Sequence, residues 1–207
     1  GIEIPKTTKR ARVDYTRYYD INVLAARFYL EKLRHLPNPG YEYIHARGLS
    51  NKILNNFGIG YASNAWNELY EHLKANGVQD EEMLKLGLVK RGKNGTLYDK
   101  FRNRVIFPII NTRGNVIGFG GRSLEKNDKT IPKYLNSDES DVFLKKNNLY
   151  GLNFAAKAIR QIGNVIVVEG YMDVISLHQA GIKNAIASLG TALTEEQARL
   201  ISRYTKN

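Results

Sequence analysis

Two short apolar runs, at residues 165–168 and 185–189, constrain the fold of this chain more than any other feature. The first run ends at Glu169 and is followed by a helical pattern over residues 171–180. A strand, a helix and a second strand in this order form a parallel pair with a right-handed crossover. Residues 151–207 are therefore predicted to form a β-α-β-α unit. Glu169 would lie at the carboxyl end of a buried parallel strand, where open α/β sheets bind their ligands.

The first 150 residues combine helical and period-two patterns. Apolar residues at helical spacing predict helices over 20–36, 50–57 and 63–77. Trp66 is expected on the apolar face of the third helix. A further short helix is predicted to begin at residues 79–82. Turn signals at Asn94-Gly95 and at 111–114 separate alternating segments and predict two antiparallel hairpins. The fold class is therefore α+β. A mixed N-terminal subdomain of antiparallel hairpins and helices over 20–150 follows a basic arm, residues 1–19, and precedes the partial α/β unit.

Basic residues are concentrated in one part of the chain. The sequence has 31 Lys and Arg against 20 Asp and Glu, and residues 90–146 alone hold 13 against 6. Residues 21–89, in contrast, hold seven of each sign. A concentrated basic segment indicates a polyanionic partner such as nucleic acid. A solvated face that aids solubility is the alternative interpretation.

Several classes of site are excluded by what the sequence lacks. It has no cysteine, which excludes disulfides and thiolate zinc sites and favours a cytosolic setting. No stretch approaches the ~20 apolar residues that a membrane span needs, so no membrane partner is expected. The four histidines have no metal-ligand spacing. No serine has the context of a nucleophile elbow, and there is no Walker-type phosphate loop.

Glu169 is the first candidate functional residue. A carboxylate at a strand end can bind a divalent metal that takes oxygen ligands, or it can act as an acid or base. Gly170 would let a phosphate come close. Asp173 could be a helix-dipole acid or could support Glu169 from outside the metal's own ligands. A surface carboxylate just past a strand is the alternative, and this stretch supplies too few acids for a complete metal site.

The second group of candidates is basic. Arg102 and Arg104 would point the same way if they lie in a strand. Glycines at 118, 120 and 121 would leave the backbone bare beside Arg122, which suits the close approach of a phosphate. Further on, Lys133, Asn136, Ser137 and Lys145 can bind phosphate oxygens, and Tyr134 and Phe143 could stack on bases. A hairpin with its arginines in water and an ordinary exposed loop remain the alternatives.

Taken together, these segments resemble the bacterial DNA primases. Residues 98–109 and 114–122 resemble the basic motif of that family, as do residues 132–137. Residues 169–174, Glu-Gly-Tyr-Met-Asp-Val, resemble the first motif of its Toprim subdomain. Residues 47–50 and 59–62 match the family in order and spacing, and the resemblance spans about residues 10–207.

The resemblance implies an RNA polymerase that lays short RNA primers on a single-stranded DNA template during replication. It would use ribonucleoside triphosphates with Mg²⁺ (or Mn²⁺) in the bacterial cytoplasm. Glu169 would be a catalytic carboxylate of the metal site, with Asp173 possible as an outer support, and Lys133 and Lys145 would also be catalytic. The implied binding residues for nucleic acid or nucleotide are Arg47, Arg102, Arg104, Arg122, Lys133, Asn136 and Lys145.

Parts of the family's pattern are missing from this sequence. There is no counterpart of the family's zinc module, which is rich in cysteine and histidine. The Asp-x-Asp motif on a later Toprim strand and the helicase-binding region are missing as well. We therefore expect a fragment cut within Toprim, with no zinc of its own. It should be inactive in primer synthesis, because one carboxylate cannot hold the catalytic metals. It should be monomeric, or weakly self-associating through an exposed strand edge.

Two other functions remain open from the sequence. The first is another Toprim enzyme, a topoisomerase or nuclease, although those families lack the basic hairpin within residues 98–137. The second is a module that binds single-stranded DNA without catalysis. Such binding would weaken steeply with salt.

Overall fold

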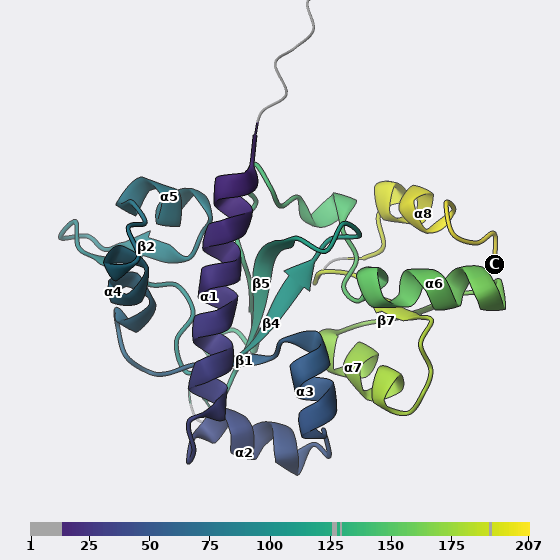
Figure 1. The fold of residues 1–207 in the computed structure, drawn as a ribbon, viewed down its shortest axis with the longest axis horizontal. Coiled ribbons are helices and arrows are strands. Elements are labelled where there is room, and N and C mark those ends of the chain that lie inside the picture. Colours follow the sequence, from purple (N-terminus) through teal and green to yellow (C-terminus); the bar gives the residue numbers. More distant parts are fainter. Residues whose placement is uncertain (1–13, 126–127, 129, 191) are drawn as a thin grey trace, which may run out of the picture.

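The computed structural model describes residues 14–125, 128, 130–190 and 192–207. The long helix α1 (Thr16–Arg34) lies across the central sheet, and a smaller unit of helices and strands lies beside that sheet (Figure 1). Most of the expected arm lies outside the described residues, but its last four residues form the first turn of α1. Asp14 fixes the entry to this helix, because its Oδ1 accepts hydrogen bonds from the Thr16 amide (2.9 Å) and hydroxyl (2.6 Å).

The central sheet is antiparallel and has the strand order β1-β4-β5-β6. Its strands are β1 (Gly60–Ala62), β4 (Arg104–Ile110), β5 (Val116–Ser123) and β6 (Tyr134–Asn136). The predicted hairpin between β4 and β5 is confirmed. Its turn is held by Asn111, whose Oδ1 accepts hydrogen bonds from the amides of Arg113 (2.9 Å) and Asn115 (3.1 Å). β6 extends the sheet by pairing with the second half of β5.

Helices and a small hairpin surround this sheet. They are α2 (Pro39–Ala46), α3 (Asn51–Phe57), α4 (Glu68–Ala75), α5 (Asp80–Lys85), β2 (Val89–Arg91) and β3 (Leu97–Asp99). α1 packs on the sheet so closely that a Cβ added at Gly60 would lie 2.5 Å from the Cβ of Tyr29, so this position requires glycine. None of the described helices is long and apolar enough to cross a membrane.

Helix α2 was not predicted from the sequence. The run 37–40, Pro-Asn-Pro-Gly, ends the preceding helix as expected, but it also starts the next one. The Oδ1 atom of Asn38 accepts a hydrogen bond from the Tyr41 amide (2.8 Å), and Pro39 is the first helical residue. Proline is favoured at this position because the amide hydrogen that it lacks would have no partner within the helix. The same residues therefore give both a stop and a start signal.

The start of α4 also differs from the prediction. The helix begins at Glu68 rather than after Ser63, and the Asp99 carboxylate accepts hydrogen bonds from the amides of Leu69 (2.8 Å) and Tyr70 (2.9 Å). Trp66 therefore lies before the helix, and it is 63% exposed. Its assignment to a buried helical face was wrong, because the partner that starts the helix comes from β3, about 30 residues later.

The C-terminal unit has the predicted β-α-β-α order. It consists of α6 (Leu152–Ile162), β7 (Ile166–Val168), α7 (Tyr171–Gln179), β8 (Ala185–Ala187) and α8 (Glu195–Ile201), with the 3₁₀ turn η1 (Lys145–Asn147) just before it. β7 and β8 pair in parallel, as predicted. β8 is buried, but Ile166 and Val167 of β7 are 39% and 43% exposed. The prediction of a buried β7 was wrong, because β8 is its one neighbouring strand within the described residues.

The two units share one hydrophobic core. Tyr150 and Ala187 exchange backbone hydrogen bonds of 2.8 and 3.0 Å, which extends β8 toward the central part of the molecule. Tyr171, at the start of α7, stacks on Phe107 of β4 with the ring planes 2° apart and the centroids 5.1 Å apart. The start of α7, and with it Glu169, is therefore fixed against the central sheet.

Candidate functional site

A cavity of about 430 Å³ opens where β6, the end of α2 and the start of α7 meet. Its lining contains eight residues that the sequence singled out: Arg47, Arg122, Lys133, Tyr134, Asn136, Glu169, Gly170 and Asp173. These residues come from four separate stretches of the chain. The fold thus brings the strand-end carboxylate and part of the basic group into one place.

The three basic side chains of this cavity have no ion pair with any described residue. The guanidinium of Arg47 lies 5.3 Å from the ring centroid of Tyr43, and that of Arg122 lies 5.5 Å from the same ring and 5.1 Å from that of Tyr134. Lys133 is exposed. The Nε atom of Arg122 is buried without a hydrogen-bond partner. Buried donors normally have partners, so these groups are available to an anionic ligand such as a phosphate.

Glu169 and Asp173 supply the acidic part of the cavity. Glu169 follows β7 and is exposed, and its carboxylate has no partner among the described residues. The Oδ2 atom of Asp173 accepts a hydrogen bond from the Gly170 amide (3.1 Å), so Asp173 caps the first turn of α7. Gly170 faces open space, because an added Cβ there would meet only Asp173 Oδ2, at 3.5 Å. Glu169 is therefore the free carboxylate beside an open backbone.

These acids fit a metal only in part. No group of three or more His, Cys, Asp or Glu residues in the described chain could hold a metal ion. Mg²⁺, however, is commonly bound through one or two carboxylates together with substrate phosphates. The residues present therefore suit a metal that is held between Glu169 and a bound triphosphate, and they do not suit a metal held by protein ligands alone.

Asn136 and Tyr171 connect β6 to the α/β unit beneath the cavity. The Tyr171 hydroxyl donates a hydrogen bond to Asn136 Oδ1 (2.7 Å), and Asn136 Nδ2 donates one to the Leu189 carbonyl (2.9 Å). Burial raises the pKa of Tyr171 far above its usual value, so its hydroxyl stays protonated and remains a donor. Asn136 thus holds β6, which directly follows Lys133, against the start of α7.

The glycines of β5 do not expose backbone to a ligand. A Cβ added at Gly120 would lie 2.4 Å from Tyr171 Cζ, and one at Gly121 would lie 2.8 Å from Phe101. At Gly118 the space is filled by Ser137, which is buried and accepts a hydrogen bond from the Phe119 amide through Oγ (2.9 Å). The prediction of a bare phosphate-binding backbone was wrong, since aromatic and polar side chains from other segments occupy that space.

Arg102 and Arg104 lie outside the 430 Å³ cavity. Both line a smaller cavity of about 160 Å³. The Arg102 guanidinium stacks 3.5 Å from the ring centroid of the exposed Trp66. Arg104 is buried, and its Nη1 donates hydrogen bonds to the carbonyls of Gly121 (3.2 Å) and Pro132 (3.0 Å). Burial lowers the pKa of Arg104. Arg104 thus holds the backbone next to Lys133, whereas the half-buried Arg102 stacks on the exposed ring of Trp66.

Lys145 also lies outside the lining of the larger cavity. It begins η1, and its amide donates to Glu139 Oε1 while its carbonyl accepts from Gln197 Nε2, each over 3.0 Å. Burial is the main reason why the pKa of Lys100 is lowered. Lys145 lies close enough to Lys100 to lower this pKa slightly further. The structure therefore ties Lys145 to α8, and Lys145 is not among the residues that line the larger cavity with Glu169.

The sequence analysis did not single out Tyr43 or Lys100. Tyr43 lies one helical turn before Arg47 on α2, and this spacing would have revealed the pair if α2 had been predicted. The Lys100 side chain is fully buried and pairs with Asp138 over 2.7 Å. No local signal in the sequence distinguishes Lys100 from the exposed lysines around it.

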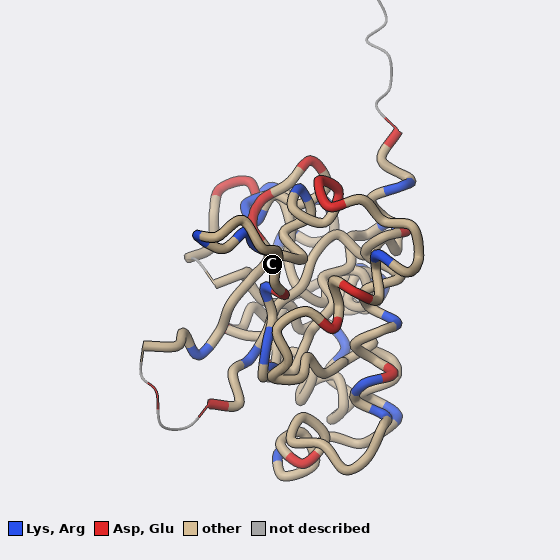
Figure 2. Tube along the Cα trace, turned by 90° about the vertical axis from the view of Figure 1, so that its left-hand side faces the viewer, with Lys and Arg blue, Asp and Glu red and all other residues tan. Residues whose placement is uncertain are grey.

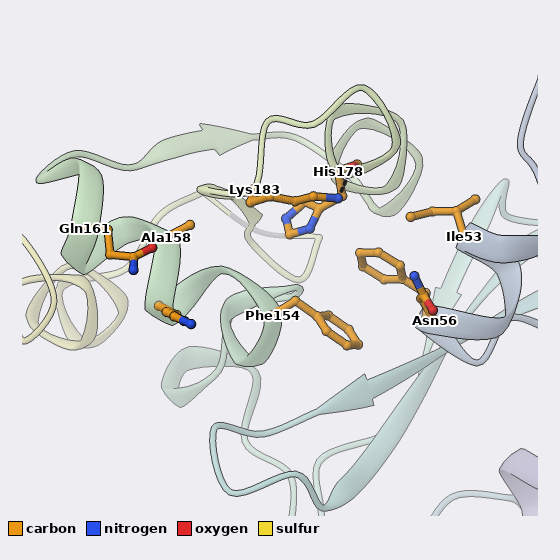
Figure 3. Close-up of a pocket in the computed structure, with 9 residues that line it drawn as sticks. Ile53, Asn56, Phe154, Ala158, Gln161, His178 and Lys183 are labelled. Atoms are coloured by element: carbon orange, nitrogen blue, oxygen red, sulfur yellow. Dashed lines mark hydrogen bonds between the residues drawn. The ribbon is translucent and has the colours of Figure 1, made fainter.

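A second cavity, of about 480 Å³, lies between α3, α6 and the end of α7 (Figure 3). Its lining includes the rings of Phe57 and Phe154, whose centroids are 4.5 Å apart, and His178 and Lys183 lie together at another side. The Lys183 ammonium donates a hydrogen bond to the His178 carbonyl. The described lining contains no carboxylate, and the His178 ring donates its Nε2 hydrogen to the Ala185 carbonyl (3.0 Å). This larger cavity therefore lacks the acid that phosphoryl-transfer chemistry requires.

The fold and the cavity define a class: a β-α-β unit with a strand-end carboxylate, docked on a basic antiparallel sheet. A family model described as the DNA primase catalytic core, N-terminal domain, matches residues 28–156, and one described as the Toprim domain matches residues 163–207. The chain belongs to the DNA primase family. A topoisomerase or nuclease of the Toprim superfamily is set aside, because the first match includes the basic hairpin.

Curated relatives agree with this assignment. The DNA primase of Clostridium acetobutylicum is 49% identical over 191 residues, which cover 92% of this chain and 31% of that protein. The DNA primase of Pseudomonas putida is 43% identical over an alignment of 211 positions that covers 98% of this chain and 32% of that protein. The chain thus spans about one third of the length of these relatives.

Solved structures confirm the fold class. The RNA polymerase domain of Mycobacterium tuberculosis primase, in complex with a double-stranded DNA oligomer with a 6-nucleotide overhang, has a TM-score of 0.86 at 33% identity, covering 92% of this chain and 60% of that one. A primase catalytic domain bound to single-stranded DNA has a TM-score of 0.82 at 40% identity, covering 93% of this chain and 61% of that one.

Proposed function

We propose that this chain is the template- and nucleotide-binding part of a primase that makes short RNA primers on single-stranded DNA from ribonucleoside triphosphates. One observation carries the proposal: the unpaired Arg47, Arg122 and Lys133 converge with the free carboxylate of Glu169 on one cavity. Polyphosphates are bound by such groups of cations, and phosphoryl transfer depends mainly on positioning and charge stabilisation.

Each polar residue of the cavity has a part in this proposal. Arg47, Arg122 and Lys133 bind phosphates, both those of the template strand and those of the incoming triphosphate. Glu169 holds Mg²⁺ or Mn²⁺, which when bound neutralises phosphate charge during transfer. Asp173 keeps the first turn of α7, and so the backbone beside Glu169, in place. Asn136 supports the cavity through its bond to Tyr171 and is not required to contact nucleotide.

The template is proposed to pass over the Arg102 and Trp66 pair. An exposed aromatic ring offers a surface on which bases of any sequence can stack, and an adjacent cation attracts the backbone. Arg104 lines the cavity beside this pair and adds positive charge along the same path, whereas Lys100 in that lining is neutralised by its ion pair with Asp138. Relatives solved with DNA support this assignment of the partner.

The acidic residues of the cavity also bear on what the 207-residue chain can do by itself. Since Glu169 is the one free carboxylate of the cavity, we propose that the chain binds DNA but does not synthesise primers. For the full-length protein, we propose the replicative helicase as a further partner and the bacterial cytoplasm as the location. A non-catalytic DNA-binding module remains the second candidate for this chain, and the exposed Trp66 ring stacked on Arg102 favours it.

Two assays test the proposal. The 207-residue chain should bind a fluorescent oligothymidine, and the logarithm of its affinity should fall with the logarithm of salt by about 0.7 per phosphate contacted. The full-length protein encoded by the gene should extend primers on single-stranded DNA with ribonucleoside triphosphates and Mg²⁺. Absence of binding at low salt would contradict the DNA role. Primer synthesis by the 207-residue chain itself would contradict the proposal that this chain binds DNA without synthesising primers.

A further inference from the structure

Gln179, the last residue of α7, binds a backbone segment that is distant in the sequence. Its Oε1 accepts a hydrogen bond from the Ser50 amide and its Nε2 donates one to the Gly48 carbonyl, each over 2.8 Å. A side-chain carboxamide has the same acceptor and donor as a peptide group. Gln179 therefore clamps the backbone on both sides of Leu49, much as a neighbouring strand would.

The clamped segment directly follows Arg47, at the junction of α2 and α3. Gly48 has a φ of +74° and nothing lies within 4 Å of the position of an added Cβ, so this side of the segment is open. Leu49 anchors the segment in the core, where it is 1% exposed. The Ser50 amide has Gln179 as its hydrogen-bond partner and no other among the described residues.

Arg47 itself is held weakly. Its guanidinium contacts the Tyr43 ring at 5.3 Å from the centroid, and it has no ion pair or hydrogen bond to another described side chain. The direction of the Arg47 side chain therefore depends on the backbone around residue 47. Two of the hydrogen bonds that fix this backbone come from Gln179.

α7 connects this clamp to the carboxylate of the cavity. The helix starts two residues after Glu169 and ends at Gln179. Val174 and Ile175, in the middle of the helix, are fully buried in the core shared by the two units. One packed helix of nine residues, about 13 Å long, thus carries Glu169 next to one end and the clamp on Arg47 at the other.

We propose that Gln179 is a positioning residue for Arg47. It links the Arg47 segment to α7 and thereby sets where the Arg47 guanidinium lies relative to Glu169. This inference rests on the proposed function, because it assigns Arg47 to binding of a nucleic acid or nucleotide. Gln179 makes no contact with the cavity itself, so it acts only through Arg47.

A double-mutant cycle tests this claim. Gln179→Ala and Arg47→Ala are made singly and together in the 207-residue chain, and binding of a fluorescent oligothymidine is measured by anisotropy. Arg47→Ala should weaken binding about 10-fold and Gln179→Ala about 3- to 10-fold, because the loss of two exposed hydrogen bonds is worth about that factor. The double variant should bind within about 2-fold of Arg47→Ala alone. Effects that multiply would overturn the proposal.

Ser176→Ala serves as the matched control. Ser176 is an exposed residue of α7 without a side-chain hydrogen bond, and this variant should bind like the unmodified chain. If Ser176→Ala weakened binding as much as Gln179→Ala does, a general disturbance of α7, and not the loss of the clamp, would explain the lower affinity. This result too would overturn the proposal.

Amide hydrogen exchange provides a readout that needs no ligand. In Gln179→Ala the Ser50 amide should exchange at least about 10-fold faster, because its one partner is removed, while amides in the middle of α7 should not change. Unchanged exchange at Ser50 would overturn the inference. If the unmodified chain bound no DNA, the proposed function would fail, whereas the exchange measurement would still decide whether Gln179 holds the Arg47 segment.

Discussion

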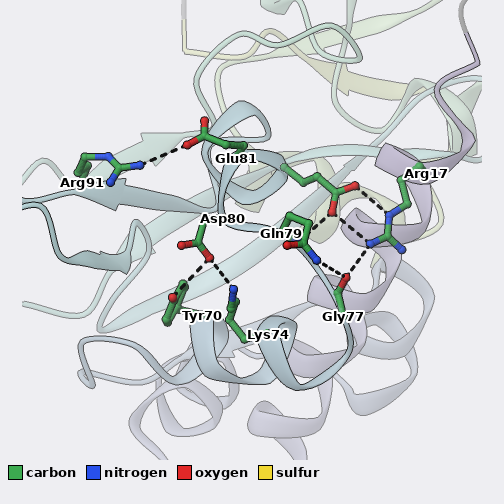
Figure 4. A network of polar contacts seen from close by, with 9 residues as sticks. Arg17, Tyr70, Lys74, Gly77, Gln79, Asp80, Glu81 and Arg91 are labelled. Atoms are coloured by element: carbon green, nitrogen blue, oxygen red, sulfur yellow. Dashed lines mark hydrogen bonds and ion pairs between the residues drawn. The ribbon is translucent and has the colours of Figure 1, made fainter.

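Basic side chains have opposite surroundings in two regions of this molecule. Around α1 and α5 they meet carboxylates: Arg17 pairs with Glu82 (2.9 Å), Lys74 with Asp80 (2.9 Å) and Arg91 with Glu81 (3.4 Å) (Figure 4). Around the 430 Å³ cavity, Arg47, Arg122 and Lys133 meet aromatic rings or solvent. We call these two regions the paired region and the unpaired region.

Basic side chains of the paired region link helices and strands of the protein, whereas those of the unpaired region are free to bind a ligand. An exposed ion pair contributes roughly 0–1 kcal/mol and neutralises its own field, so the paired region offers little attraction to a polyanion. In the unpaired region the positive charges add, and the buried Nε of Arg122 lacks a partner. The location of basic residues in the sequence does not show this. Lys and Arg are spread over most of the trace (Figure 2), and only some of them remain unpaired.

The largest expected effect concerns the carboxylate of the unpaired region. In the full-length protein, Glu169→Gln should lower primer synthesis by about 100- to 1000-fold, because a neutral amide cannot hold a metal against the triphosphate. DNA binding should be retained within about 3-fold. Glu81→Gln, in the paired region, is the control and should retain synthesis. Full activity of Glu169→Gln in a steady-state primer assay would contradict the role of this residue.

The next effect concerns the contact that joins the two units. Gly120→Ala should destabilise the chain by about 2 kcal/mol, because the new Cβ would lie 2.4 Å from the buried ring of Tyr171. Urea unfolding monitored by circular dichroism measures this. Gly170→Ala, whose Cβ would meet only Asp173 Oδ2 at 3.5 Å, should cost less than about 1 kcal/mol. Equal losses for the two variants would contradict the packing described for Tyr171.

A smaller effect is expected at the exposed ring beside Arg102. Trp66→Ala should weaken binding of oligothymidine about 10-fold, since stacking on one aromatic ring is worth roughly 1–3 kcal/mol per base. The melting temperature should change little, because Trp66 is 63% exposed. Leu36→Ala, another exposed apolar side chain at 57%, should bind normally. If both variants bound equally well, the proposed template path would be wrong.

The smallest effect is expected in the paired region and depends on pH. The hydrogen bond from Arg17 holds the pKa of Glu82 below its usual value. A lowered pKa in the folded state stabilises the protein at pH above the unfolded value near 4.5, and this contribution is lost as the pH falls through the folded pKa. Arg17→Ala should therefore be less stable by less than about 1 kcal/mol at pH 7, and the difference should shrink toward pH 3. A constant difference across this range would contradict the pairing.

Much of the fold follows from local signals in the sequence. The helix predicted over 50–57 is α3, which Ser50 caps, and the Ser50 Oγ accepts a hydrogen bond from the Ile53 amide. The Asn111 turn and the parallel pair of β7 and β8 were also predicted correctly, because turn chemistry and apolar periodicity act within a few residues. The prediction failed where a distant partner decides the outcome. Trp66 is exposed because Asp99, far along the chain, starts α4 after it.

The candidate site was predictable in its members but not in its geometry. The resemblance to primases named the residues around the cavity, and their roles stay predictions until they are tested. The prediction for the glycines of β5 failed because glycine permits close packing as readily as it permits ligand approach, and the position of Tyr171 shows that close packing applies at Gly120. Likewise, the sequence does not reveal that Arg104 is buried against backbone carbonyls while Arg122 faces the cavity.

The comparison of the two regions is tested most directly by the salt dependence of DNA binding in two arginine variants. Arg122→Ala should weaken binding of oligothymidine by the 207-residue chain about 10-fold and reduce the slope of log affinity against log salt by about 0.7, because one phosphate contact is lost. Arg91→Ala removes the same charge from the paired region and should leave both the affinity and the slope nearly unchanged. Equal losses in the two variants would contradict the claim that the unpaired arginines form the binding site.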